Sequence, residues 1–140
     1  MSTSRGIYRL KELNPSLDVG ELSVLLGSLS SGALSITVYG SAARGKYVRG
    51  LSDVDVLVVT AGEPPCRART FGLSLGDVNV VYMSREEFCG ALTLGNQIAL
   101  EAVSAGVVVF GEDPKNLCGN PPEQEKSPPV GLTPTTCGRH

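Results

Sequence analysis

Two aspartates separated by a single residue, Asp53 and Asp55, are the side chains in this chain best suited to chemistry. They come directly before the apolar run 56–59, which is rich in valine and typical of a buried strand. Because side chains alternate along a strand, we expect both carboxylates on one face. Carboxylate oxygens are the ligands that Mg²⁺ and Mn²⁺ prefer. The spacing therefore predicts a divalent-metal site where this strand begins.

A glycine-serine turn precedes the aspartates and suits a phosphate group. The apolar run 34–39 is typical of a strand, it stops at Gly40 and Ser41, and the cations Arg44 and Lys46 follow closely. We expect a short helix to begin at this turn, so that its backbone N–H groups and its positive end face the phosphate. The alternative interpretation of Lys46 is an ordinary cation on a solvated loop.

The order of these residues resembles the G-S…D-x-D signature of the nucleotidyltransferase superfamily typified by DNA polymerase β, in particular its minimal single-domain members. The segments that carry the resemblance are Gly40-Ser41, Arg44-Gly45 and Ser52-Asp53-Val54-Asp55. The resemblance implies that Gly40, Ser41, Arg44, Lys46 and Ser52 contact the phosphates of ATP or another NTP. It also implies that Asp53 and Asp55 bind Mg²⁺ or Mn²⁺. Positioned cations are the main means of stabilising charge in such transfers.

Members of this superfamily use a third carboxylate, on a neighbouring strand, as metal ligand and general base. The matching position here holds Asn79, whose amide can ligate a cation but cannot accept a proton. Asp77 lies two residues earlier and on the same strand face, about 6–7 Å away along the strand. Three interpretations stay open: Asp77 is the third catalytic carboxylate, Asn79 occupies the site of a slow enzyme, or the site binds nucleotide without transferring it.

The apolar pattern predicts an α/β (α+β) fold, a small mixed sheet flanked by helices, as in polymerase β-like nucleotidyltransferases. Leucines at helical spacing indicate a helix ending near residue 31, runs 67–75 and 77–83 indicate a hairpin, and Ser84 with Glu87 forms a capping box before a further helix. A second helix over 97–105 and a last strand over 107–110 follow. We expect an N-terminal extension over 1–16, the nucleotidyltransferase domain over 17–114 and a proline-rich, disordered tail over 115–140.

Composition narrows the class of protein. Apolar residues make up 41% and charged residues 19% of the chain, and no apolar run reaches the roughly 18 residues of a membrane span. The net charge of −2 argues against a protein that coats nucleic acid. With no secretory signal, we expect a cytoplasmic protein with free or buried thiols rather than disulfides at its four cysteines, Cys66, Cys89, Cys118 and Cys137.

These observations predict a metal-dependent nucleotidyltransferase that moves a nucleoside monophosphate from ATP or another NTP to an acceptor. The chain is too short to hold an elaborate substrate domain, so a partner protein is expected to supply the acceptor. The resemblance implies a HEPN-like helical partner, as in pairs of toxin and minimal-nucleotidyltransferase antitoxin, and a homo-oligomer is compatible with the sequence. The alternative is a non-catalytic nucleotide-binding or interaction module, and a small-molecule transferase is third.

Overall fold

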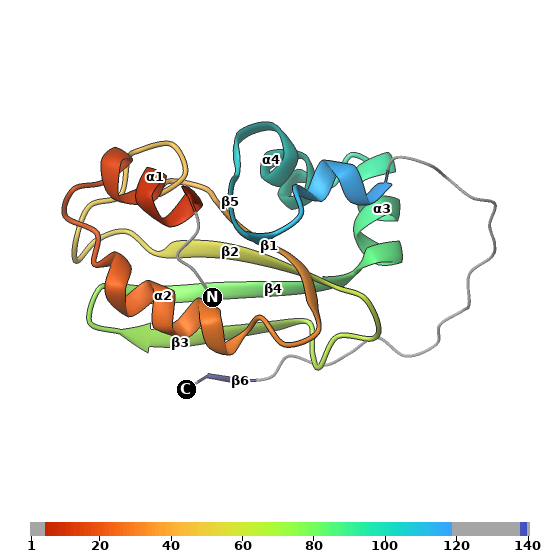
Figure 1. Cartoon of the computed structure of the whole chain (residues 1–140), viewed down its shortest axis with the longest axis horizontal. Helices are drawn as coiled ribbons and strands as arrows, with labels where there is room; N and C mark the ends of the chain where they lie inside the picture. The colour runs from red at the N-terminus through yellow and green to blue at the C-terminus, as the bar shows by residue number, and fades with distance from the viewer. Residues whose placement is uncertain (1–4, 119–137, 140) are drawn as a thin grey trace.

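The computed structural model describes residues 5–118 and 138–139, and its centre is a mixed sheet (Figure 1). The strands lie in the order β5-β1-β2-β4-β3-β6. Their bounds are β1 Ala33–Tyr39, β2 Val54–Thr60, β3 Ala68–Leu73, β4 Gly76–Ser84, β5 Val107–Gly111 and β6 Gly138–Arg139. The helices are α1 Arg5–Leu13, α2 Val19–Ser28, α3 Arg85–Thr93 and α4 Gln97–Ala105, followed by the 3₁₀ helix η1 Pro114–Cys118.

Helices cover both faces of the sheet, and each face has its own apolar cluster. Leu10 of α1 and the leucines of α2 pack with Val54, Val56 and Val58 of β2. The alternate residues of β2, Leu57 and Val59, pack on the other face with α3 and α4. Because Asp55 alternates with Val54 and Val56, it lies on the face covered by α3 and α4, which we call the α3/α4 face. Figure 1 shows α3, α4 and η1 gathered at one end of the sheet.

Strand pairing brings the segments of the expected site together. β2 runs antiparallel to β1, with Asp55 opposite Tyr39, and parallel to β4, with Asp55 opposite Asn79. β3 and β4 form the predicted antiparallel hairpin. The predicted capping box at the start of α3 is present, since Ser84 and Glu87 exchange hydrogen bonds between side chain and backbone. The mixed α+β architecture predicted from sequence is therefore confirmed.

The structure corrects the description of residues 1–16 as an extension. Residues 5–13 form α1, in which Ile7 and Leu10 are buried in the core. A Cβ atom at Gly6 would stand 1.9 Å from the carbonyl oxygen of Val108, so the backbones of α1 and β5 touch at this glycine. The helix escaped prediction because its short sequence carries only these two inward apolar residues and ends before Pro15.

Two further expectations about the C-terminal part are revised. Residues 115–118 belong to η1, where Leu117 and Cys118 pack on the cluster of α3 and α4, and residues 138–139 pair with β3. The remainder of the expected tail, 119–137 and 140, lies outside the described residues. The prediction of free thiols is wrong: Cys89 and Cys118 form a disulfide that ties α3 to η1, and Cys66 is disulfide-bonded as well. Cys137 lies outside the described residues.

None of the helices in the described part of the chain has both the length and the apolar character needed to cross a membrane.

Candidate active site

The carboxylates of Asp53 and Asp55 converge on one atom. The side-chain nitrogen of Asn79, Nδ2, lies 3.2 Å from Oδ2 of Asp53 and 3.3 Å from Oδ1 of Asp55. The oxygen of the same amide, Oδ1, accepts a hydrogen bond from the hydroxyl of Thr70 at 3.1 Å. Parallel pairing of β2 and β4 places these groups side by side, so the structure brings together both predicted aspartates and the asparagine at the position of the third carboxylate.

Asp77 lies on the same face of β4 as Asn79 but nearer the start of the strand. It is exposed and pairs across the hairpin with Gly72. Among residues 5–118 and 138–139, no three His, Cys, Asp or Glu side chains gather so that they could hold a metal ion. The structure therefore does not join Asp77 to Asp53 and Asp55 in a three-carboxylate cluster.

Gly40 ends β1 in a conformation that favours glycine and lies against Asp55. Its φ is 79°, in the left-handed region, and a Cβ atom there would stand 2.7 Å from Oδ2 of Asp55. Residues 40–46, which we call the phosphate turn, do not open the short helix expected at Ser41. Instead they form consecutive turns, in which the N–H of Arg44 bonds the carbonyl of Ser41 at 3.1 Å and that of Lys46 bonds the same carbonyl at 2.8 Å.

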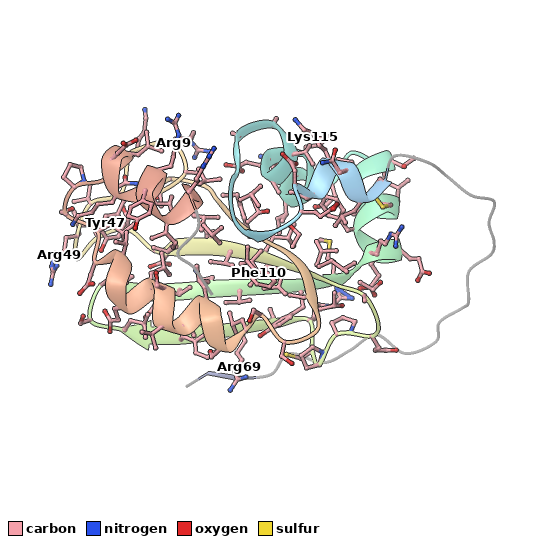
Figure 2. All side chains as sticks on the ribbon, in the orientation of Figure 1. Arg9, Tyr47, Arg49, Arg69, Phe110 and Lys115 are labelled. Atoms are coloured by element: carbon pink, nitrogen blue, oxygen red, sulfur yellow. A yellow bond between two sulfur atoms is a disulfide. The ribbon has the colours of Figure 1, made fainter. Side chains whose placement is uncertain are left out.

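A buried asparagine from the end of α1 fixes the phosphate turn from behind. Asn14 is 3% exposed, donates to the carbonyl of Ala42 at 2.8 Å, and accepts from the N–H of Tyr47 at 3.1 Å. The Tyr47 hydroxyl in turn donates to the carbonyl of Leu75 (Figure 2). Sequence reasoning missed Asn14, because its partners are 28 and 33 residues away and no local pattern marks them.

Arg44 lies between the phosphate turn and α4, where it forms an ion pair with Glu101. The pair is accessible, with side-chain exposures of 49% and 22%, so a phosphate could compete for the guanidinium. The two residues of this ion pair are 57 positions apart, so no local pattern in the sequence indicates it.

The site is electronegative on its α3/α4 face. Partial burial raises the pKa of the Asp55 carboxyl, the charges of Asp53 and Glu101 raise it further, and the Asn79 hydrogen bond and Arg44 oppose the shift. Burial and the charges of Asp55 and Glu101 together raise the pKa of Tyr39 to about 12. A cation between these carboxylates would relieve their mutual repulsion.

The remaining predicted phosphate ligands have different surroundings. Ser41 is half-buried at the start of the phosphate turn, and Lys46 is exposed on the same turn. The Ser52 hydroxyl accepts a hydrogen bond from the N–H of Val48 at 2.9 Å and so closes the loop that leads into β2. Arg49 in that loop points away from the body of the molecule (Figure 2). Ser52 is thus already engaged in loop structure, whereas Lys46 is accessible to a ligand.

Comparison with protein families matches the part of the chain that contains the candidate site. The model of the family "Nucleotidyltransferase domain" matches residues 19–86, from the start of α2 through β4 into α3. The matched segment contains the phosphate turn, Asp53, Asp55 and Asn79. Comparison with curated proteins found no match. The segment from Val19 to Glu86 is therefore similar to a nucleotidyltransferase domain, which supports nucleotidyl transfer as the class of reaction.

Proposed function

We propose that this protein is a metal-dependent nucleotidyltransferase that moves a nucleoside monophosphate from ATP or another NTP to an acceptor hydroxyl. The observation that carries the proposal is the convergence of Asp53 and Asp55 on one point beside the phosphate turn. Two carboxylates held together where a strand begins repel each other, and a bound cation would relieve that repulsion. The family match supports the same reaction class.

The donor set fits Mg²⁺ or Mn²⁺. Magnesium is commonly held by one or two protein carboxylates, with substrate phosphates and water completing its shell. Asp53 and Asp55 would be these carboxylates. Asn79 could add its amide oxygen by a flip of the side chain, because the Thr70 hydroxyl can accept a hydrogen bond as well as donate one. When bound, the metal would neutralise charge on the transferred phosphoryl group.

The other residues of the site bind and orient the nucleotide. Gly40 and Ser41 would present backbone and hydroxyl donors to the β and γ phosphates. Arg44 would exchange its partner Glu101 for a phosphate, a change from one anionic acceptor to another. Lys46 would add a second, more mobile positive charge.

Proton removal from the acceptor is the step that Asn79 cannot perform. Asp77 remains the candidate for a general base, although the structure places it nearer the start of β4 than Asn79. The second proposed function, a non-catalytic nucleotide-binding or interaction module, rests on this same observation. We propose that a HEPN-like helical partner protein supplies the acceptor of the transferase, or is bound by the interaction module, and that both proteins are cytoplasmic.

The test uses ATP labelled in its α-phosphate. The full-length protein is incubated with labelled ATP and Mg²⁺, with and without the protein encoded by the neighbouring gene, and label on protein is followed. We expect Mg²⁺-dependent binding of ATP by calorimetry and transfer of label to the partner. Both should be lost in the Asp53→Asn, Asp55→Asn double variant and kept in Asp113→Asn, which changes an aspartate outside the site.

Two results would change the proposal. ATP binding at parental affinity in the double variant would remove the metal site from the mechanism. Metal-dependent binding without transfer would favour the interaction module. Asp77→Asn tests whether Asp77 is the general base. If it is, this variant should bind ATP but transfer no label.

A further inference from the structure

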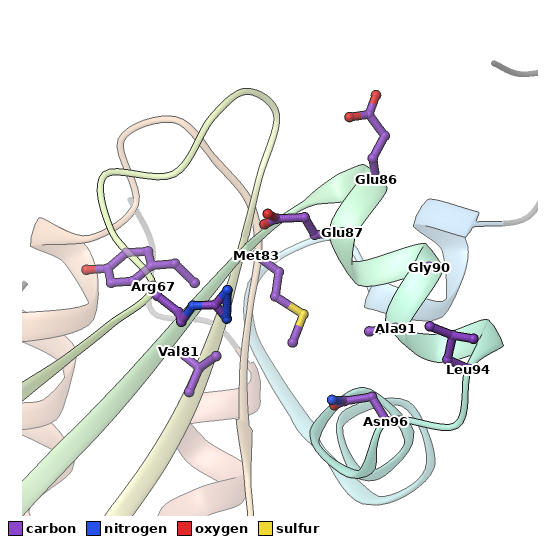
Figure 3. Close-up of a pocket in the computed structure, with 10 residues that line it drawn as sticks. Arg67, Val81, Met83, Glu86, Glu87, Gly90, Ala91, Leu94 and Asn96 are labelled. Atoms are coloured by element: carbon purple, nitrogen blue, oxygen red, sulfur yellow. The ribbon is translucent and has the colours of Figure 1, made fainter. Parts of the chain in front are cut away.

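A pocket of about 420 Å³ lies beside the nucleotidyltransferase site, between β4 and α3 (Figure 3). One wall consists of Val81 and Met83 of β4, and the other of Gly90 and Ala91 of α3, with Leu94 at the rim. The volume falls within the range of about 300–1,000 Å³ typical of small-molecule sites. None of the phosphate-turn residues lines this pocket, so it is separate from the nucleotide site built above.

The pocket and the metal site share one face of one strand. Asn79, Val81 and Met83 alternate along β4, so all three lie on the α3/α4 face. Val81 is two residues beyond Asn79, or about 6–7 Å along the strand. A group seated against Val81 therefore has its nearest end within reach of the point where Asp53 and Asp55 converge.

The order of the strands indicates which reactant of nucleotidyl transfer would occupy the pocket. The phosphate turn follows β1, the aspartates stand on β2, and the pocket is built on β4, so the aspartates lie between phosphate turn and pocket. Nucleotidyl transfer places the attacking and leaving oxygens in line on opposite sides of the α-phosphorus. If the phosphate turn holds the leaving pyrophosphate, the nucleophile must approach from the side of β4, where the pocket lies.

The lining selects the chemistry of the occupant. Val81, Met83, Ala91 and the 87%-exposed Leu94 offer apolar contact to a ring-sized body. Glu87 adds one carboxylate against the single guanidinium of Arg67, whereas the side chain of Glu86 points away from the pocket (Figure 3), so the charges at the pocket balance and favour an uncharged occupant. Asn96 is held through its Oδ1 by the N–H of Ala99 at 3.1 Å, which leaves its amide N–H₂ to donate to an uncharged oxygen.

We propose that this pocket between β4 and α3 is the acceptor site, and that it takes an uncharged hydroxyl-bearing group with an apolar, ring-sized body. The inference rests on the proposed transferase function. The acceptor oxygen forms a bond to the α-phosphorus, the bond from that phosphorus to the bridging oxygen of pyrophosphate breaks, and pyrophosphate leaves. The hydroxyl proton passes to the general base, for which Asp77 is the candidate, and from there to solvent water.

A matched pair of glycine variants tests the pocket without damaging the fold. Gly90 and Gly27 are both helical, and a Cβ atom at either position meets nothing within 4 Å. Gly90→Leu fills the pocket, whereas Gly27→Leu places the same side chain on α2, on the other face of the sheet. Both should keep or raise the thermal midpoint, because leucine favours a helix more than glycine does.

The probes are three small phenols that differ in charge: 4-ethylphenol (neutral), tyramine (cationic) and 4-hydroxyphenylacetate (anionic). Each is titrated into the ¹⁵N-labelled protein with Mg²⁺ and α,β-methylene-ATP, and amide shifts are mapped. We expect saturable shifts at Val81, Ala91 and Asn96 with the neutral probe. Both charged probes should bind more weakly, because placing a charge against apolar side chains costs free energy. Gly90→Leu should abolish these shifts and Gly27→Leu should keep them.

The outcomes separate this inference from the transferase proposal. Shifts at Ser41, Asp53 and Asp55 on adding the ATP analogue report on the nucleotide site, and their absence would refute the transferase proposal itself. If they appear but the phenols give no saturable shift at the pocket, or an equal one in Gly90→Leu, the acceptor site is refuted. It is also refuted if the ATP analogue alone shifts the pocket amides, since the nucleobase would then occupy it.

Discussion

Asn79 sets the charge of the proposed metal site, because it places an amide where two carboxylates meet. Asn79→Asp would put a third carboxylate at this point and remove the two hydrogen bonds that Asn79 donates. Without a cation, repulsion among three carboxylates should lower the free energy of unfolding by roughly 1–2 kcal/mol. With Mg²⁺, calorimetry should show metal binding about tenfold or more tighter than in the parent protein, since each added anionic ligand favours a hard cation.

The control for this substitution is Asn116→Asp, which adds the same charge at an exposed position of η1. It should change neither metal affinity nor stability by more than a few tenths of a kcal/mol. If Asn79→Asp were no more responsive to Mg²⁺ than Asn116→Asp, the point where the aspartates converge would not be a metal site.

Gly40 is confined by its backbone conformation and by the nearby carboxylate, and a second glycine separates the two effects. Gly50 has a φ of 84°, close to the 79° of Gly40, but a Cβ atom at Gly50 would meet nothing within 4 Å. Gly50→Ala should therefore cost only the left-handed conformation, about 1–2 kcal/mol. Gly40→Ala should cost a similar amount, because the atom nearest its new Cβ is the terminal oxygen of Asp55, which can turn aside, but the substitution should displace that carboxylate.

Denaturant unfolding of both glycine variants should give similar losses of stability, and ATP binding by calorimetry should fall only in Gly40→Ala. Unchanged ATP binding in Gly40→Ala would show that the position of the Asp55 carboxylate beside the phosphate turn does not matter for the nucleotide.

At the scale of elements, α1 holds the phosphate turn through Asn14. Asn14→Ala would leave the carbonyl of Ala42 and the N–H of Tyr47 without their buried partner. We expect a loss of about 1–3 kcal/mol in the free energy of unfolding, as for other buried polar groups left unsatisfied. ATP affinity should fall as well, because the turn loses its support. Asn116→Ala removes the same side chain from an exposed site and should have little effect on either measurement.

The elements that the sequence predicted are those with a strong local pattern. The leucine stripe of α2, the β3–β4 hairpin and the capping box at Ser84 all depend on residues within a few positions of one another. The helix expected at Ser41 is replaced by turns that Asn14 holds from another element, and α1 has too few apolar residues to show a period. Local patterns cannot predict structure that contacts between distant segments determine.

The residues of the candidate site fall into the same two groups, those that local spacing indicates and those that depend on contacts between distant segments. Asp53, Asp55, Gly40 and Ser41 could be found from their spacing, whereas the amide contacts of Asn79 depend on parallel pairing of β2 with β4. The placement of Glu101 depends on the docking of α4 beside the phosphate turn, far from Arg44 in the sequence. Residue types and spacing therefore predicted that the two aspartates come together, and strand pairing places Asn79 rather than Asp77 beside them.

At the scale of the whole molecule, the Cys89–Cys118 disulfide closes a segment that contains α4 and β5. The two cysteines are 29 residues apart, and a crosslink of this span stabilises a fold by roughly 3–4 kcal/mol, by limiting the unfolded chain. The Cys89→Ala, Cys118→Ala double variant should lose about this amount in denaturant unfolding. A loss well below 1 kcal/mol would show that packing of η1 on α3 suffices without the bond.

Different segments of the chain cover the two edges of the sheet, and this affects the tendency of the protein to self-associate at high concentration. Exposed strand edges invite pairing with strands of other molecules, which leads to aggregation. At the β5 edge, α1 lies so close at Gly6 that no side chain fits between the helix and the Val108 carbonyl. At the other edge, residues 138–139 pair with β3 at Arg69 and Thr70. A foreign strand would have to displace a helix at one edge or the chain's own C-terminal residues at the other, so truncation of the C-terminus would open a route to self-association through β3.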